Sequence, residues 1–169
     1  MKERYLRHKV YISISLMLLS MNSFSQQFSE KEQIERIIAS ALINFADLKG
    51  DLKEIKGQDS AFVALVTLES IRSAEITKIE EGSKDYRLTI EIDSSSLSQC
   101  KSVFKLWRKK MHTIIDGSFQ MEDLRQSFGS TGGVTGYLFI NNQVKVALFY
   151  TYMNQYDISR VYLTFEKTQ

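Results

Sequence analysis

Three segments of the chain alternate apolar and polar residues, and this pattern limits the folds that the chain can adopt. Residues 86–92, 143–152 and 158–166 place aliphatic or aromatic side chains at every second position. Alternate side chains of a β-strand point to opposite faces of the sheet, so we expect each segment to have one buried and one solvated face. Burial on one face only is typical of antiparallel sheets.

Two amphipathic helices are predicted beside these strands. The first begins with the capping-box spacing Ser29–Glu32, carries apolar residues at intervals of three and four, and is expected to end at Gly50. The second, over residues 97–114, has one continuous apolar stripe that contains Cys100. Two helices cannot cover both faces of a wide sheet. We therefore expect an α+β fold in which both helices pack on one face of a curved, mainly antiparallel sheet.

About six strands are expected, in the chain order α-β-β-β-α-β-β-β. Turn residues at 81–84 and at Asn141-Asn142 predict hairpins, and residues 129–133 predict a hairpin loop. Residues 118–128 fit either a short helix or an edge strand. The expected strands are 61–68, 74–80, 86–92, 134–140, 143–152 and 158–166.

The N-terminus has the pattern of a secretory signal peptide. A basic start is followed by a short apolar run from Val10 to Met21 and by the small residues Ser23 and Ser25. The apolar run is too short and too rich in serine for a membrane span. We predict a signal peptide at 1–25 and a single α+β domain at 26–169, exported to a periplasm or to the medium, with no transmembrane helix after cleavage.

Removal of this segment changes the sign of the net charge. The whole chain has 22 basic and 20 acidic residues and a net charge of +2. Cleavage after Ser25 removes four basic residues and one acid, which leaves 18 and 19 and a net charge of −1. A global attraction to nucleic acid then has no support, and nucleic acid is not expected as a partner.

The order of elements and the segment Phe45-Ala46-Asp47-Leu48-Lys49-Gly50 resemble small exported single-domain α+β proteins of unknown function. The resemblance covers most of the chain after residue 25. It implies a fold, and it implies no activity and no site residues.

The predicted exported part has few residues that could bind a metal or take part in nucleophilic catalysis. Cys100 and His112 are its only thiol and imidazole, and helical spacing places them on opposite faces of the second helix. Cys100 is expected in the core and His112 on the surface. We therefore predict no metal, no cofactor and no catalytic residue among them.

Carboxylate pairs and the glycine-rich segment are equally weak candidates. Glu80-Glu81 precede a turn and Glu122-Asp123 lie in the ambiguous segment, where adjacent acids are usually solvated. The segment Gly129-Ser130-Thr131-Gly132-Gly133 has no lysine after its glycines and is followed by a strand, unlike a phosphate-binding loop.

Two surfaces remain as candidates for binding. If the aliphatic strand faces meet the helices, the other sheet face shows polar and aromatic side chains, which suits recognition. The second helix also has a basic side that could contact an anionic envelope surface. The sheet-face candidates are Arg87, Thr89, Lys145, Phe149, Thr151, Arg160 and Tyr162, and the basic candidates are Lys105, Arg108 and Lys109.

The sequence thus favours an exported, non-catalytic protein that binds an envelope or secreted component of unknown identity. Two alternatives stay open. One is a small hydrolase that uses carboxylates, and the other is a protein held at an envelope surface by the basic helix face.

Overall fold

The computed structural model describes residues 29–168 apart from 54–59, 81–82, 116 and 154–157, so the predicted signal peptide lies outside the described residues. The helices are α2 (Glu30–Ala41) and α3 (Leu97–Ile114), and a short 3-10 turn, η1, spans Gly129–Thr131. The strands are β1 (Lys49–Lys53), β2 (Ala61–Ala64), β3 (Ser73–Lys78), β4 (Tyr86–Ser95), β5 (Gln120–Ser127), β6 (Gly132–Ile140), β7 (Val144–Met153) and β8 (Ile158–Lys167).

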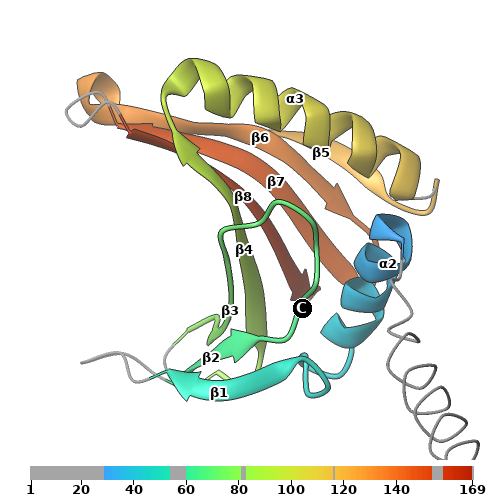
Figure 1. The fold of residues 1–169 in the computed structure, drawn as a ribbon. Coiled ribbons are helices and arrows are strands. Elements are labelled where there is room, and N and C mark those ends of the chain that lie inside the picture. The colour runs from blue at the N-terminus through green and yellow to red at the C-terminus, as the bar shows by residue number, and fades with distance from the viewer. Residues whose placement is uncertain (1–28, 54–59, 81–82, 116, 154–157, 169) are drawn as a thin grey trace, which may run out of the picture.

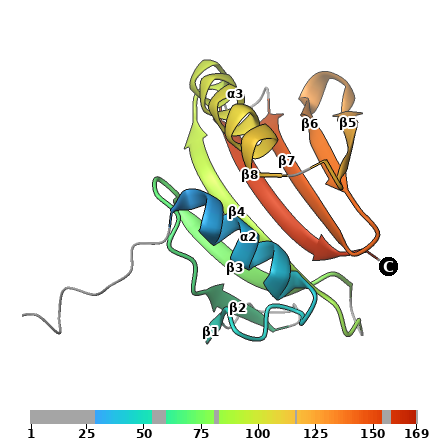
Figure 2. The same cartoon turned by 90° about the vertical axis from the view of Figure 1, so that its right-hand side faces the viewer.

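All eight strands form one antiparallel sheet in the order β1-β2-β3-β4-β8-β7-β6-β5. The sheet is strongly curved, and α2 and α3 both lie on the same side of it (Figures 1 and 2). The α+β class and the antiparallel sheet are therefore confirmed. The prediction of about six strands in the order α-β-β-β-α-β-β-β was wrong, because the chain adds one strand after each helix.

Both additional strands lack the alternation that identifies a half-buried strand. β1 follows α2 at the place where Gly50 was expected to end the helix. A Cβ at Gly50 would lie 2.9 Å from the carbonyl oxygen of Val63, so glycine permits the close approach of β1 to β2. β5 is the edge strand that was one of two alternatives for residues 118–128.

The capping box that begins α2 is formed as predicted. Glu32 Oε2 accepts a hydrogen bond from the Ser29 backbone N–H at 2.7 Å, and Ser29 Oγ accepts one from the Glu32 N–H at 3.3 Å. The bond from the Ser29 backbone is the main reason why the pKa of Glu32 lies below its ordinary value.

The end of α2 differs from the prediction. The helix stops at Ala41, and Asn44 and Phe45 adopt φ angles of 54° and 57°, which turn the chain out of the helix. Phe45 and Leu48 are still fully buried, so the apolar spacing that suggested a longer helix reflects burial of a series of turns.

Other predicted elements are shorter or shifted by a few residues. β2 ends at Ala64 instead of at residue 68. Just after Ala64 the chain turns, because the Val66 N–H donates a hydrogen bond to the Ala64 carbonyl oxygen at 3.0 Å. β3 and β4 form the predicted hairpin, of which residues 81–82 lie outside the described part. In the turn between β6 and β7, Asn141 Oδ1 accepts hydrogen bonds from the backbone of Gln143 and Val144.

The core lies between the two helices and the sheet, where the apolar stripe of α3 packs as predicted. Its buried members meet aliphatic residues from the central strands. The fully or almost fully buried residues include Ile34, Ile37, Leu88, Ile90, Cys100, Trp107, Met111, Val146, Leu148, Val161, Leu163 and Phe165. Neither described helix has the length and apolar character needed to cross a membrane.

Candidate binding face

The side of the sheet opposite the helices carries all the residues that the alternation predicted for it. Strand register fixes this arrangement, because residues paired across antiparallel strands point to the same face. Phe149 lies opposite Tyr162, and Thr151 lies opposite Arg160. We call this side of the sheet the open face. Its sequence-predicted members are Arg87, Thr89, Lys145, Phe149, Thr151, Arg160 and Tyr162.

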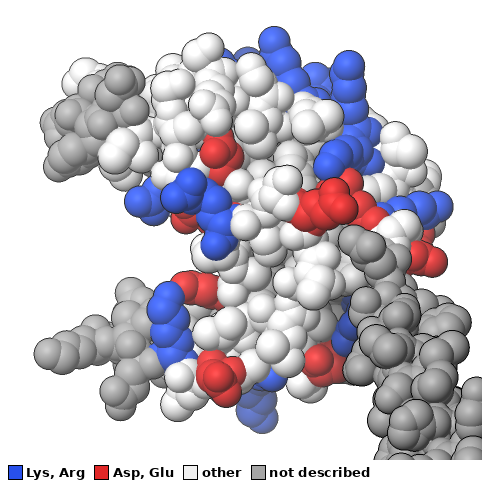
Figure 3. All heavy atoms as spheres, viewed as in Figure 1, with Lys and Arg blue, Asp and Glu red and all other residues white. Residues whose placement is uncertain are grey.

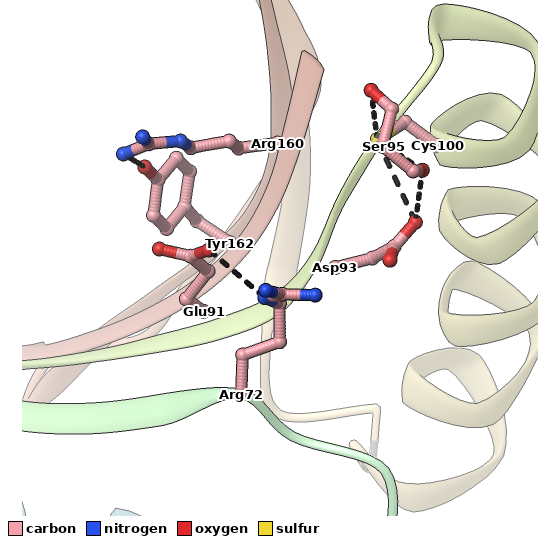
Figure 4. Close-up of polar contacts among 7 residues, drawn as sticks. All are labelled: Arg72, Glu91, Asp93, Ser95, Cys100, Arg160 and Tyr162. Carbon is pink, nitrogen blue, oxygen red and sulfur yellow. Dashed lines mark hydrogen bonds and ion pairs between the residues drawn. The ribbon is translucent and has the colours of Figure 1, made fainter. Parts of the chain in front are cut away.

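A bulge in β4 changes which side chains reach the open face. The register of β4 against β8 shifts between Glu91 and Asp93. Figure 4 shows the result: Glu91, Arg160 and Tyr162 lie on one side of the sheet, whereas Asp93 turns toward α3 on the other side. Simple alternation along the whole of β4 would have placed Asp93 beside Glu91. The bulge therefore removes one carboxylate from the open face.

Glu166 is the most buried charged residue of the open face. It is only 7% exposed. Arg87 donates from Nε and Nη2 to Glu166 Oε2 at 2.7 and 2.6 Å, and Lys145 contacts the other carboxylate oxygen. Burial opposes ionisation of Glu166, but the hydrogen bonds from Lys145 and Arg87 outweigh it and hold the pKa of the carboxyl below its ordinary value. Glu166 is therefore an ionised anchor for two cations.

An arginine and a tyrosine mark the other end of the open face. Arg160 Nη1 donates a hydrogen bond to the Tyr162 hydroxyl at 3.4 Å (Figure 4). The hydrogen bond and the electrostatic attraction to Tyr162, and then the charge of Glu91, raise the pKa of Arg160. Glu91 itself lies 3.5 Å from Arg72. The ring of Phe149 lies 5.4 Å from that of Tyr162, so an aromatic pair borders the cation.

A hollow of about 430 Å³ adjoins Arg160 at the ends of β7 and β8. Three of its apolar side chains are unusually exposed, namely Phe128 at 47%, Met153 at 55% and Ile158 at 49%. Figure 3 shows the molecule hollowed on this side, with basic and acidic side chains at its rims. The lining consists of Phe128, Thr151, Tyr152, Met153, Ile158, Arg160 and Tyr162. It combines a mainly apolar and aromatic wall with one guanidinium.

A second hollow of about 430 Å³ lies at the opposite end of these strands, around Glu166. Two of its three cations, Arg87 and Lys145, are already paired with Glu166. Its remaining lining comes from Ile79, Glu80, Lys167 and Thr168. This end offers mainly charged groups, three of which bind one another, whereas the Arg160 end offers apolar surface and a cation.

Sequence reasoning missed several residues of the open face. Glu166 continues the alternation of Arg160, Tyr162 and Thr164 by one more step, so that pattern could have indicated it. Met153 and Ile158 likewise continue the alternation of Thr151 and Arg160 by one step each, so their face could also have been predicted. Their pairing with each other depends on the order of strands, and the position of Phe128 depends on the turn after β5.

Cys100 lies in the core, as predicted, on the helix side of the bulge. Its Sγ is 3.4 Å from Ser95 Oγ and 3.7 Å from Asp93 Oδ2, and Ser95 donates to Asp93 at 2.6 Å (Figure 4). The thiol is fully buried. His112 is exposed on α3, with its ring against Phe139. The predicted separation of Cys100 from His112 is consistent with these positions.

The basic candidates Lys105, Arg108 and Lys109 are all exposed on α3, and Figure 3 shows lysine and arginine side chains gathered over this helix. Arg108 lies over the ring of Tyr137 at 4.5 Å. The adjacent Lys110 bonds to Glu30 at 2.8 Å. Contact of this basic surface with an anionic envelope stays a prediction.

The acids of the two carboxylate pairs are exposed, as expected, where the structure describes them. Glu122 and Asp123 are exposed on β5, and Glu80 is exposed two residues beyond the end of β3, while Glu81 lies outside the described residues. Among the residues that the structure describes, no group of three or more His, Cys, Asp or Glu side chains could hold a metal ion.

Comparisons with known proteins give no relative of the chain, since no protein-family model, curated protein or solved structure matches it.

Proposed function

We propose that the chain is an exported binding protein, and that the hollow beside Arg160 on the open face holds an anionic ligand with an aromatic or aliphatic body. The observation that carries the proposal is the composition of this hollow. Most of its wall is apolar or aromatic, and a single cationic side chain stands among these groups. Binding sites for small ligands commonly combine such apolar walls with a few oriented polar groups.

Charge and exposure support Arg160 as the group that orients the ligand. Its guanidinium is charged at any physiological pH, and Tyr162 and Glu91 raise its pKa further. Its hydrogen bond to Tyr162 uses one nitrogen of a group with five N–H donors, so the others can meet a carboxylate or sulfonate. Phe128, Met153 and Ile158 would lose exposed apolar surface to the ligand body, which favours association.

The state of Glu166 supports binding over acid catalysis by this carboxylate. A general acid at neutral pH needs a raised pKa, whereas the cations around Glu166 lower it. The hydrolase alternative would also need a second acid across a cleft. Glu91, the next acid of the open face, lies against Arg72.

The aromatic sulfonate 8-anilinonaphthalene-1-sulfonate tests the proposal, because it joins an apolar ring system to an anion. We expect its fluorescence to rise on binding to the folded protein. Arg160→Gln should weaken binding about tenfold, the effect of losing one strong charged contact. Met153→Gln should weaken it as well, through lost apolar contact.

Lys101→Gln is the matched control, because Lys101 is an exposed cation on α3, away from the open face. It should leave the affinity unchanged. Equal losses in Arg160→Gln and Lys101→Gln would mean that the probe responds to overall charge, and the hollow would then have no special role. Absence of binding to the unmodified protein would reject the proposed ligand class.

A further inference from the structure

The outer edge of β5 is a second surface that suits a partner, independent of the open face. All eight residues of β5 pair with β6, and within the described part of the chain no strand pairs with its other side. Figure 2 shows β5 at the outer limit of the sheet. Every β5 side chain is exposed except the half-buried Leu124. An unpaired edge of this length is a template for another strand.

Charge is distributed unequally along β5. Glu122 and Asp123 precede Leu124, and Arg125 follows it. Charges on an edge strand usually discourage pairing. In an antiparallel pair of identical strands, however, the first half of one strand lies opposite the second half of the other. A strand with acids in one half and a base in the other is therefore complementary to a second copy of itself.

Geometry limits the registers that two copies can adopt. A two-fold axis perpendicular to a continuous sheet keeps equivalent faces on the same side, and opposed residues must share a face. The axis must therefore lie between one residue and the same residue of the partner strand, so that this residue faces its own copy. An axis at Asp123 would oppose two carboxylates. An axis at Arg125 would oppose two guanidinium groups.

An axis at Leu124 avoids these clashes. It places Leu124 against the partner's Leu124, on the open-face side. Asp123 then lies opposite the partner's Arg125, and the symmetry repeats this pair. Glu122 lies opposite the partner's Gln126, an uncharged hydrogen-bonding group. Opposite charges in directly opposed positions stabilise strand pairing.

We propose that two copies of the chain pair antiparallel through β5, about a two-fold axis at Leu124, to form one continuous sheet. The dimer satisfies the outer backbone groups of β5 in both copies. It also places the two open faces on the same side of the assembly.

Charge exchange tests the pairing. The protein purified from the cells that make it should have the mass of a dimer in sedimentation velocity. Asp123→Arg should raise the dissociation constant about tenfold or more, because two attractive pairs become repulsive. The double variant Asp123→Arg/Arg125→Asp restores opposite charges and should restore dimerisation. Asp123 and Arg125 are 63% and 76% exposed, so these variants should keep the native circular dichroism spectrum.

Cysteine crosslinking tests the register. Leu124→Cys should form a disulfide-linked dimer under mild oxidation, because residues opposed across antiparallel strands have Cα atoms about 4.5–5.5 Å apart, within disulfide range. Met121→Cys is the matched control, since its copies would lie about 20 Å apart along the strands. The native Cys100 is fully buried and should not contribute.

A monomer at all concentrations would overturn the proposal. A dimer that Asp123→Arg does not weaken would place the interface elsewhere, with the same consequence. Crosslinking by Met121→Cys without crosslinking by Leu124→Cys would reject the axis at Leu124.

Discussion

At the scale of single residues, Glu166 links two cationic side chains from the strands on either side of it. Its carboxylate joins Arg87 of β4 to Lys145 of β7 across the central strand β8. Breaking a buried ion pair by removing one partner is costly, because the remaining charges lose their compensation. Here the cost is reduced, since Arg87 and Lys145 are 41% and 39% exposed and remain partly hydrated.

We expect Glu166→Gln to lower the free energy of unfolding at pH 7 by about 1–3 kcal/mol. The folded pKa of Glu166 lies below its ordinary value of 4.5, so its stabilising effect is present above pH 4.5 and is lost as the pH falls through the folded pKa. The difference between the variant and the unmodified protein should therefore shrink below pH 4.5. Urea denaturation at pH 7 and at more acidic pH measures both effects.

Glu35→Gln provides the comparison, because Glu35 pairs with Lys31 at 3.7 Å on the exposed side of α2. It should change the free energy of unfolding by less than about 0.5 kcal/mol. A Glu166→Gln protein as stable as the Glu35→Gln protein would show that the three-residue cluster contributes little.

The sheet face on which these residues lie could be predicted from the sequence, but the residues that they contact could not. Alternation assigned Arg87 and Lys145 to the open face, since it depends only on position within a strand. It could not predict that both would contact Glu166, because cross-strand neighbours depend on the order of strands in the sheet. Asp93 shows the same limit. The bulge in β4 places it on the helix side of the sheet, and nothing in the alternation of residues along β4 indicates the bulge.

At the scale of elements, β6 and β7 fit closely where Gly136 faces Phe149. A Cβ at Gly136 would overlap the Leu148 carbonyl and lie 2.5 Å from Phe149 Cβ. The glycine therefore leaves room for the aromatic side chain on the open face, an arrangement found where aromatic residues cover strand glycines.

Gly136→Ala should lower the free energy of unfolding by about 1–3 kcal/mol, because the added methyl group has no space without displacing β7 or Phe149. Thermal or urea denaturation measures this change. Gly117→Ala is the control, since a Cβ there meets nothing within 4 Å, and its effect should stay within about 0.5 kcal/mol. Equal stability of the two variants would contradict the close fit.

Elements were predictable from sequence where burial is one-sided. The stripe of α3 and the alternation of β4, β7 and β8 arise from contact with the core, and these elements were predicted nearly in full. β5 is exposed on both faces and β1 is short and polar, so neither carries a burial pattern. The predicted end of α2 was wrong because here a burial pattern exists without a helix: Phe45 and Leu48 are buried although they lie beyond its last turn.

At the scale of the whole molecule, the proposed export makes a prediction about the N-terminus. If residues 1–25 are a signal peptide, mass spectrometry of the protein isolated from the producing cells should find an N-terminus near Gln26. Ser23→Arg/Ser25→Arg should block cleavage, because signal peptidase requires small residues at these positions. A native chain that retains Met1 in the cytoplasm would contradict both the export and the proposed extracytoplasmic ligand.

The position of β8 also has a consequence for when the protein can fold during synthesis. β8 comes last along the chain among the described strands, yet it lies in the middle of the sheet, between β4 and β7. Until it arrives, β4 has no neighbour on one side and the core lacks Val161, Leu163 and Phe165. We therefore expect the nascent chain to stay without its native fold until β8 has been synthesised, because its central pairings join residues far apart in sequence. If the chain is exported, as proposed, a secretion channel that engages it before β8 is complete would meet a chain that still lacks its central strand pairings.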